Sequence, residues 1–242
     1  MSLIVENLTH AYTSPGLSER AVLDIPHWQV EAGEQVLLRG ISGSGKTTLM
    51  NILAGLLRPT QGEVTVDGYR LFAHSEAKRD RFRAGRIGYV FQMHHLISNL
   101  SAQENVEMPL IFAGKGDYIQ RRLLARALLT RLGLAEFANH RPGQLSTGQR
   151  LRVTVARSLI TRPHLLLADE PTAALDPYAR DCVMEMLQEI CREEKAILIV
   201  ASHDPVLNRR FDRVVDLEAG KLRESGPARF VISDPRHLDM AA

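Results

Sequence analysis

One segment limits the possible folds of this chain more strongly than its composition does. A short apolar run, residues 35–38, leads directly into Gly40-Ile41-Ser42-Gly43-Ser44-Gly45-Lys46-Thr47, which has the spacing G-x-x-x-x-G-K-T. Leucine and isoleucine then recur at helical spacing, at positions 49, 52, 53 and 56. A strand, such a loop and a helix in that order are typical of a phosphate-binding loop, so the sequence predicts a nucleoside-triphosphate site.

The residue types in this loop explain how it would hold a triphosphate. Glycines allow the backbone to curl so that successive N–H groups point at phosphate oxygens, and the following helix adds its positive end. We expect the Lys46 ammonium to reach the β- and γ-phosphates and the Thr47 hydroxyl to ligate Mg²⁺. The residues expected to contact the nucleotide here are Gly40, Ser42, Gly43, Ser44, Gly45, Lys46, Thr47 and Thr48.

Two adjacent carboxylates follow another apolar run. Residues 165–168 have the continuous apolar pattern of a strand buried on both faces, and Asp169 and Glu170 come directly after them. Open α/β sheets bind ligands at the carboxyl ends of their strands, where these side chains are expected. Alone, the pair also fits a solvated strand end. Together with the phosphate-binding loop it predicts a Mg²⁺ role for Asp169 and a general-base role for Glu170.

Strands and helices alternate along most of the chain. We predict strands at residues 3–7, 21–30, 35–38, 63–66, 87–90, 165–168, 196–201, 212–217 and 221–224. Helices are predicted after the phosphate loop and at residues 76–84, 150–161 and 177–194, with a polar loop at residues 14–20. Residues 101–143 show only helical spacing and are interpreted as an all-helical insertion. The order predicts an α/β fold, with a mainly parallel sheet covered by helices on both faces.

Composition argues against other classes of protein. The chain has 242 residues, 45% of them apolar, and a net charge of +2, whereas a general nucleic-acid binder usually carries a strong basic excess. No nucleic-acid partner is therefore expected. The longest apolar run is far shorter than the ~20 residues of a spanning helix, and the N-terminus lacks a signal-peptide pattern. Cys182 and Cys191 share a predicted helix, about 13 Å apart along its axis, so two reduced thiols of a cytosolic protein are expected.

A phosphate loop and an acidic strand also occur in kinases, helicases and GTPases, so other motifs must decide. Leu145-Ser146-Thr147-Gly148-Gln149 precedes a predicted helix, and Ala173-Ala174-Leu175-Asp176 follows the acidic strand. Gln92 and His203 each follow a strand, and Tyr12 lies near the N-terminus. These five features resemble the signature motif, D-loop, Q-loop glutamine, switch histidine and adenine-stacking aromatic of the ABC (ATP-binding cassette) ATPases. They occur in that family's order over nearly the whole chain.

The resemblance implies a division of the fold. An ABC cassette has a P-loop NTPase core with a mainly parallel sheet, an N-terminal antiparallel β subdomain and an inserted α-helical subdomain. We expect residues 1–95 and 162–225 to form the core and the β subdomain, and residues 96–161 to form the helical subdomain with the signature motif. Residues 226–242 are expected to be a peripheral tail.

The resemblance also implies that two ATP molecules lie between two copies of the chain, head to tail. Ser146, Thr147, Gly148 and Gln149 of one copy would face the γ-phosphate held by the other, and Asp176 would lie at the seam. Tyr12 would stack on adenine. The implied catalytic residues are Glu170, His203 and Gln92, and the implied Mg²⁺ ligands are Thr47, Gln92 and Asp169.

Two positions depart from the family pattern. Thr147 stands where the signature motif usually has glycine, and a Cβ there restricts φ and fills space beside the phosphate. We expect ATP binding to persist, because Ser146 and Gly148 remain, but closure or turnover to be slower. Ala173 replaces the more usual serine of the D-loop, with a smaller expected effect.

Three stretches are similar to cassettes of the lipoprotein-releasing and macrolide-exporter group: residues 87–96, residues 104–110 and residues 139–142. This similarity implies separate transmembrane ABC subunits as partners and a peripheral position on the cytoplasmic side of the inner membrane. The implied work is export or extraction of a lipid, lipoprotein or small molecule. The alternative within the same group is a cell-division cassette that signals through a membrane partner without transport.

Other classes are less favoured. Soluble ABC ATPases of DNA repair or translation usually carry two cassettes or a long coiled-coil insertion. Intact Lys46, Asp169, Glu170 and His203 disfavour a catalytically inactive binding module. The adjacent His94 and His95 suggest a metal site, but neighbouring side chains point apart, so a partner-facing loop is the preferred interpretation.

Overall fold

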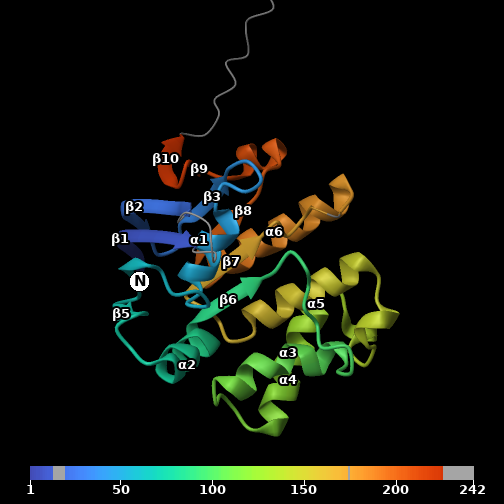
Figure 1. Ribbon diagram of the computed structural model, residues 1–242. Coiled ribbons are helices and arrows are strands. Elements are labelled where there is room, and N and C mark those ends of the chain that lie inside the picture. Colours follow the sequence, from blue (N-terminus) through green and yellow to red (C-terminus); the bar gives the residue numbers. More distant parts are fainter. Residues whose placement is uncertain (13–19, 174, 226–242) are drawn as a thin grey trace, which may run out of the picture.

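The computed structural model describes residues 1–12, 20–173 and 175–225 (Figure 1). The loop predicted at residues 14–20 lies outside these ranges except for its last residue. Ala174 of the predicted D-loop and the predicted tail, residues 226–242, also lie outside them.

A mainly parallel sheet forms the centre of the molecule, as predicted. Its strands lie in the order β10-β9-β3-β8-β7-β6, and every neighbouring pair is parallel except β9 and β10. The strands are β3 (Gln35–Arg39), β6 (Ile87–Val90), β7 (Leu165–Asp169), β8 (Ile197–Ala201), β9 (Arg213–Glu218) and β10 (Lys221–Ser225). Every residue of β7 and β8 is buried, which explains their continuous apolar pattern.

A second, antiparallel sheet contains the N-terminal strands. Its order is β2-β1-β4-β5, with bounds β1 (Ser2–Tyr12), β2 (Arg20–Glu31), β4 (Gln61–Val66) and β5 (Tyr69–Arg70). One apolar cluster joins this sheet to the parallel one, because it contains Leu3 of β1, Leu49 of α1 and Ile199 of β8. The antiparallel β subdomain that the resemblance implied is therefore present and packs on the core.

The helices are α1 (Lys46–Leu53), α2 (Glu76–Arg86), α3 (Ala102–Phe112), α4 (Tyr118–Arg131), α5 (Thr147–Leu159) and α6 (Pro177–Glu193). The 3₁₀ turns are η1 (Ala135–Phe137), η2 (Pro142–Gln144) and η3 (Pro205–Arg210). Helices α3, α4 and α5 form the lower lobe in Figure 1, and residues 101–143 contain helices and turns without a strand. The exact division at residues 96 and 161 stays a prediction. In α6, Cys182 is exposed and Cys191 is buried, and burial raises the pKa of the Cys191 thiol to about 12.

The start of α5 corrects one prediction. The sequence pattern predicted a helix from Arg150, but the helix begins at Thr147. The Ser146 hydroxyl accepts a hydrogen bond from the Gln149 N–H, and the Gln149 side chain accepts one from the Ser146 N–H. This capping box satisfies two N–H groups that the helix itself leaves without partners, and so begins the helix inside the predicted signature motif.

A bidentate ion pair holds the end of β3, where the chain enters the phosphate loop. Arg39 Nε and Nη2 each lie 2.7 Å from the Asp216 carboxylate oxygens, across β3 and β9. Ser225 of β10 also bonds this carboxylate. The Arg39 guanidinium, followed by the Ser225 hydroxyl, holds the pKa of Asp216 below its ordinary value. The pair therefore fixes the strand that positions the loop.

We expect Asp216→Asn to lower the free energy of unfolding at neutral pH by about 1–2 kcal/mol, because the charge-assisted bonds to Arg39 are lost. Since the folded-state pKa of Asp216 is depressed, its contribution is complete above about pH 4 and disappears as the pH falls through the folded-state pKa. Urea unfolding at neutral and acidic pH is the measurement. The free energies of unfolding of the wild type and Asp216→Asn should become equal in acid.

Asp24→Asn is the matched control, because Asp24 pairs with Lys221 of β10 only at 3.6 Å and both side chains are more than half exposed. Its unfolding should change little at any pH. An equal loss in the two variants, or a loss for Asp216→Asn that persists in acid, would contradict the assignment of stability to the Arg39 pair.

Candidate active site

The phosphate loop connects β3 to α1, and its backbone requires glycine. Gly43 and Gly45 have φ values of 77° and 105°, in the left-handed region that disfavours side chains. A Cβ on Gly40 would lie 2.5 Å from the Ser44 Oγ and 2.8 Å from the Leu217 carbonyl oxygen. The loop is therefore curled as the sequence predicted: Gly40 has no room for a side chain, and the backbone at Gly43 and Gly45 would be strained with one.

Lys46 lies inside this curl. Only 8% of the residue is exposed, and its Nζ donates hydrogen bonds to the carbonyl oxygens of Gly40 (2.7 Å) and Ile41 (3.2 Å). The Ser44 hydroxyl is buried without a hydrogen-bond partner among the described residues. The loop thus offers a positive charge and an unpaired hydroxyl at one place, which suits a phosphate group.

The two acidic residues at the end of β7 lie beside the loop. Asp169 is 5% exposed, and its Oδ1 has no partner in the part of the chain that the structure describes. Burial raises the pKa of the Asp169 carboxyl, and the Glu170 charge acts in the same direction. The Thr47 hydroxyl and the Lys46 ammonium lower the same pKa. The fold therefore brings Asp169 to Lys46 and Thr47, although it is far from both in the sequence.

Glu170 is held in a strained conformation by three hydrogen bonds. Its φ is 47°, and its N–H donates to the Ala201 carbonyl oxygen at 2.8 Å. The carboxylate Oε1 lies 2.7 Å from His203 Nδ1, and Oε2 accepts from the Ser202 hydroxyl at 3.1 Å. A non-glycine residue in the left-handed region costs of order 1 kcal/mol or more and persists only where its surroundings fix it. The carboxylate is 11% exposed and the imidazole 69% exposed, so the pair opens to solvent on the histidine side.

Tyr12 and Gln92 lie at the edges of this site. The Tyr12 hydroxyl is 3.2 Å from Thr48 Oγ1, and the Tyr12 ring meets the buried His10 ring edge-on at 4.7 Å. Gln92 is exposed and lies two residues after the end of β6, the neighbour of β7. The structure thus places Tyr12 against the start of α1 and Gln92 in a loop after the strand next to β7.

Two residues near the site were missed by the sequence analysis. Ser202 donates a hydrogen bond to Glu170 and lies between the end of β8 and His203. Its position next to the predicted switch histidine could have identified it from the sequence. Arg157 of α5 donates to the carbonyl oxygens of His94 (2.8 Å) and His95 (2.6 Å), so it holds the loop that contains Gln92. Within the described ranges, no three His, Cys, Asp or Glu side chains group as a metal site.

The signature residues lie away from the phosphate loop of the same chain. Figure 1 places the start of α5 at the right of the view, across the molecule from α1. Ser146 and Thr147 are exposed, and their hydrogen-bond partners, Gln149 and Arg150, belong to the same helical turn. Asp176 is also exposed, and its side chain caps α6 by accepting from the Ala179 N–H at 2.9 Å.

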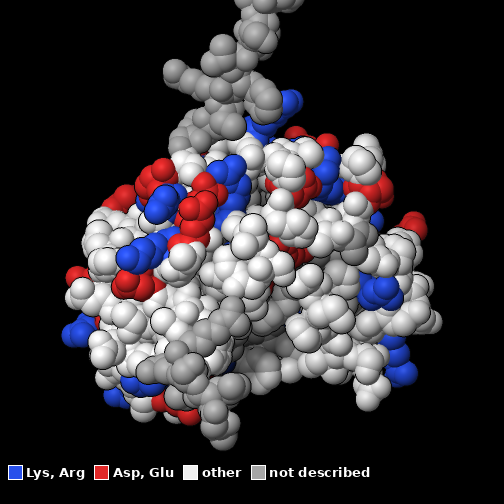
Figure 2. Space-filling view, turned by 45° about the horizontal axis from the view of Figure 1, so that its top comes forward, with Lys and Arg blue, Asp and Glu red and all other residues white. Residues whose placement is uncertain are grey.

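Helix length and surface charge are two further features that concern possible partners. Among the described residues, the longest helices are too short or too polar to cross a membrane. On the face seen in Figure 2, basic and acidic side chains are interspersed and most of the surface is uncharged.

Comparisons with known proteins agree with the motifs. A family model described as ABC transporter matches residues 23–173. The lipoprotein-releasing system ATP-binding protein LolD of Chromohalobacter salexigens is 42% identical over 219 residues, covering 90% of this chain and 92% of that protein. The macrolide export ATP-binding/permease protein MacB of Chromobacterium violaceum is 44% identical over 216 residues, which are 88% of this chain and 33% of that longer protein.

A solved structure is similar over almost the whole fold. The dimeric structure of a post-hydrolysis state of the ATP-binding cassette MJ0796, bound to ADP and Pi, has a TM-score of 0.86 and is 37% identical. The match covers 94% of this chain and 100% of that one. Motifs, fold and relatives agree, and the chain belongs to the ABC transporter family.

Proposed function

We propose that this chain is the ATP-hydrolysing subunit of a transport or mechanotransmission complex whose transmembrane parts are separate polypeptides. The observation that carries the proposal is the Glu170 carboxylate, which His203 and Ser202 hold at the end of β7 beside the phosphate loop. The similarity to LolD over nearly its full length supports extraction or export of a lipid, lipoprotein or small molecule. The cytoplasmic side of the inner membrane is the corresponding location.

Each residue at this site has a chemical role in the proposal. Glu170 accepts a proton from the attacking water, His203 orients that water and contacts the γ-phosphate, and Gln92 contacts the water from the neighbouring loop. Lys46 and the loop N–H groups neutralise phosphate charge. Tyr12 stacks on adenine, and its bond to Thr48 keeps the ring beside the start of α1.

Mg²⁺ fits the residues that are present. Asp169 offers a buried carboxylate oxygen with no protein partner among the described residues, and it lies beside the Thr47 hydroxyl. Oxygen ligands of this kind are those that Mg²⁺ prefers. Thr47, Gln92 and Asp169 would hold the ion, which supplies positive charge against the β- and γ-phosphates when bound.

The second half of each site comes from another copy of the chain. Ser146 and Gly148 stand at the N-terminal end of α5, where N–H groups and the helix dipole favour an anion. In the chain itself this end points away from the phosphate loop, so it is available to a second molecule (Figure 1). The dimeric state of the similar cassette MJ0796 supports the same arrangement here.

A groove next to the Gln92 loop suits the membrane partner. Its volume is about 680 Å³, and it lies between α2, β6 and α3. Leu56, Phe91, Pro109, Phe112 and Arg157 are among its lining residues. Arg157 belongs to α5 and also bonds the backbone of the Gln92 loop. A segment docked in this groove would therefore contact both the loop and α5. Pull-down from membranes with identification of the partner tests this proposal and separates a transporter from the cell-division alternative.

We expect Glu170→Gln to bind ATP with unchanged affinity and to accumulate as a nucleotide-bound dimer without turnover. The amide keeps the size and the hydrogen-bond acceptor of the carboxylate but cannot take a proton from water. Steady-state phosphate release and size-exclusion chromatography with ATP and Mg²⁺ measure the two effects. Full hydrolysis by this variant would refute the general-base assignment.

We expect Thr147→Gly to raise the ATPase rate. The substitution removes the Cβ and the hydroxyl that accepts from Arg150 Nη2 at 3.1 Å, and so frees space and backbone at the γ-phosphate end of α5. Nucleotide binding should change little, because Ser146 and Gly148 remain. Phosphate release at saturating ATP is the measurement, and an unchanged rate would show that Thr147 does not limit turnover.

A further inference from the structure

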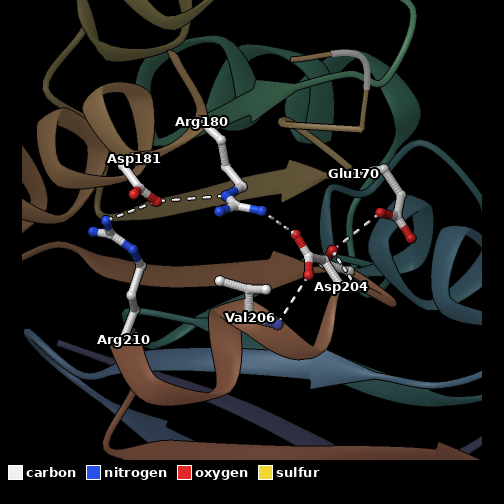
Figure 3. Close-up of polar contacts among 7 residues, drawn as sticks. Glu170, Arg180, Asp181, Asp204, Val206 and Arg210 are labelled. Carbon is white, nitrogen blue, oxygen red and sulfur yellow. Dashed lines mark hydrogen bonds and ion pairs between the residues drawn. The ribbon is translucent and has the colours of Figure 1, made fainter. Parts of the chain in front are cut away.

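An ion pair lies behind the candidate active site. Arg180, in the first turn of α6, places its Nη1 3.1 Å from the Asp204 Oδ2, and Asp204 directly follows His203 (Figure 3). The two side chains are only 17% and 28% exposed, so solvent screens the pair less than it screens a surface ion pair. The contact joins α6 to the segment that carries His203.

Asp204 is connected to Glu170 through one hydroxyl. The Asp204 N–H donates to the Ser202 Oγ at 3.1 Å, and the Ser202 Oγ donates to the Glu170 Oε2 at 3.1 Å. A hydroxyl has a single hydrogen, and here an N–H occupies its acceptor side, so that hydrogen is directed at the carboxylate. Ser202 is 2% exposed, which keeps water from replacing either bond.

The same residues enclose a polar cavity. It has a volume of about 270 Å³ and is lined by Glu170, Thr172, Arg180, Ser202, His203 and Asp204, together with Ala173 and Leu175 of the predicted D-loop and Pro205. Arg180 therefore reaches the wall of the space next to Glu170. Its route to Glu170 runs through Asp204 and Ser202.

We propose that Arg180 is a positioning residue for ATP hydrolysis: through Asp204 and Ser202 it holds the Glu170 carboxylate in the orientation that activates water. The proposal rests on the proposed role of Glu170. Asp176 caps the start of α6, and the family resemblance places it at the dimer seam. The same contacts therefore link that seam to the Glu170 carboxylate within one chain.

The remainder of the charged cluster acts as an internal control. Asp181 contacts Arg180 Nε at 3.4 Å and Arg210 Nη2 at 2.9 Å (Figure 3). The Asp181 side chain is 47% exposed, and exposed pairs contribute little. Loss of the Arg210 pair leaves the contacts from Arg180 to Glu170 in place, so Arg210 should not matter for hydrolysis.

The test compares steady-state ATP hydrolysis by the full-length chain and its variants. Arg180→Met keeps the length of the side chain but removes its charge, and Asp204→Asn keeps the acceptor that caps η3 at Val206. We expect each to lower kcat about tenfold or more, since small displacements of a catalytic group cost this much. KM for MgATP should change by less than about twofold, because the phosphate loop is not touched.

Three further variants sharpen the test. Arg180→Lys should recover most of the lost kcat, because the ammonium can still pair with Asp204. Arg210→Gln should match the wild type. The double variant Arg180→Met with Asp204→Asn should lose no more than either single variant, since both act on one contact.

Normal kcat in Arg180→Met, parallel changes in kcat and KM, or losses that multiply in the double variant would each overturn the proposal. If Arg180→Met does not fold, Asp204→Asn decides alone: it must lower kcat at unchanged KM. Glu170→Gln separates the two levels of inference. An inactive Glu170→Gln beside a fully active Arg180→Met removes only the role of Arg180, whereas an active Glu170→Gln refutes the general-base role of Glu170 on which the proposal rests.

Discussion

The parallel pairing of β8 with strands on both sides determines where the functional groups of this cassette lie. Ala201, the last residue of β8, pairs with Leu38 of β3 on one side and with Asp169 of β7 on the other. The Ser202 N–H then donates to the Leu38 carbonyl oxygen, and the Glu170 N–H donates to that of Ala201. These pairings place the ends of β3, β7 and β8 side by side. The phosphate loop, the acidic pair and His203 therefore follow the strands at the same edge of the sheet. A register slip of one residue in β8 would turn its side chains over and separate them.

The site keeps two unfavourable features that its surroundings stabilise. Glu170 adopts a positive φ, and Asp169 buries an oxygen without a protein partner in the described chain. Each costs free energy of order 1 kcal/mol or more in a folded protein. The hydrogen bond from Ser202 and the contact with His203 hold the Glu170 side chain. The fully buried strands β7 and β8 fix the backbone on either side of it. The two strands thus stabilise a strained backbone conformation at Glu170, in the candidate active site, and such strain is common at functional sites.

Much of this structure follows from local sequence signals, and the rest depends on contacts between distant residues. The phosphate loop, the buried strands and the helical lobe are predicted by glycine spacing and apolar periodicity alone. The Arg39–Asp216 pair joins residues 177 positions apart, and nothing local in either strand indicates the other. Ser202 and Arg180 were likewise not singled out, because a serine after a strand and an arginine in a helix are common. Even the start of α5 was placed late, since the capping box overrode the apolar pattern.

In the proposed arrangement, one copy of this chain holds only part of each site, because the signature residues at the start of α5 and the acidic pair at the end of β7 lie on separate elements. The N-terminal end of α5 offers N–H groups to an anion, yet the phosphate loop lies across the molecule on another set of elements (Figure 1). Strand pairing cannot bring the two together within a chain, because α5 is packed on β6 and α3. In the proposed arrangement, the α5 end of a second copy would face the phosphate loop. Arg157 of α5 donates hydrogen bonds to the carbonyl oxygens of His94 and His95 in the Gln92 loop. A movement of α5 when two copies close would therefore pass to this loop through Arg157.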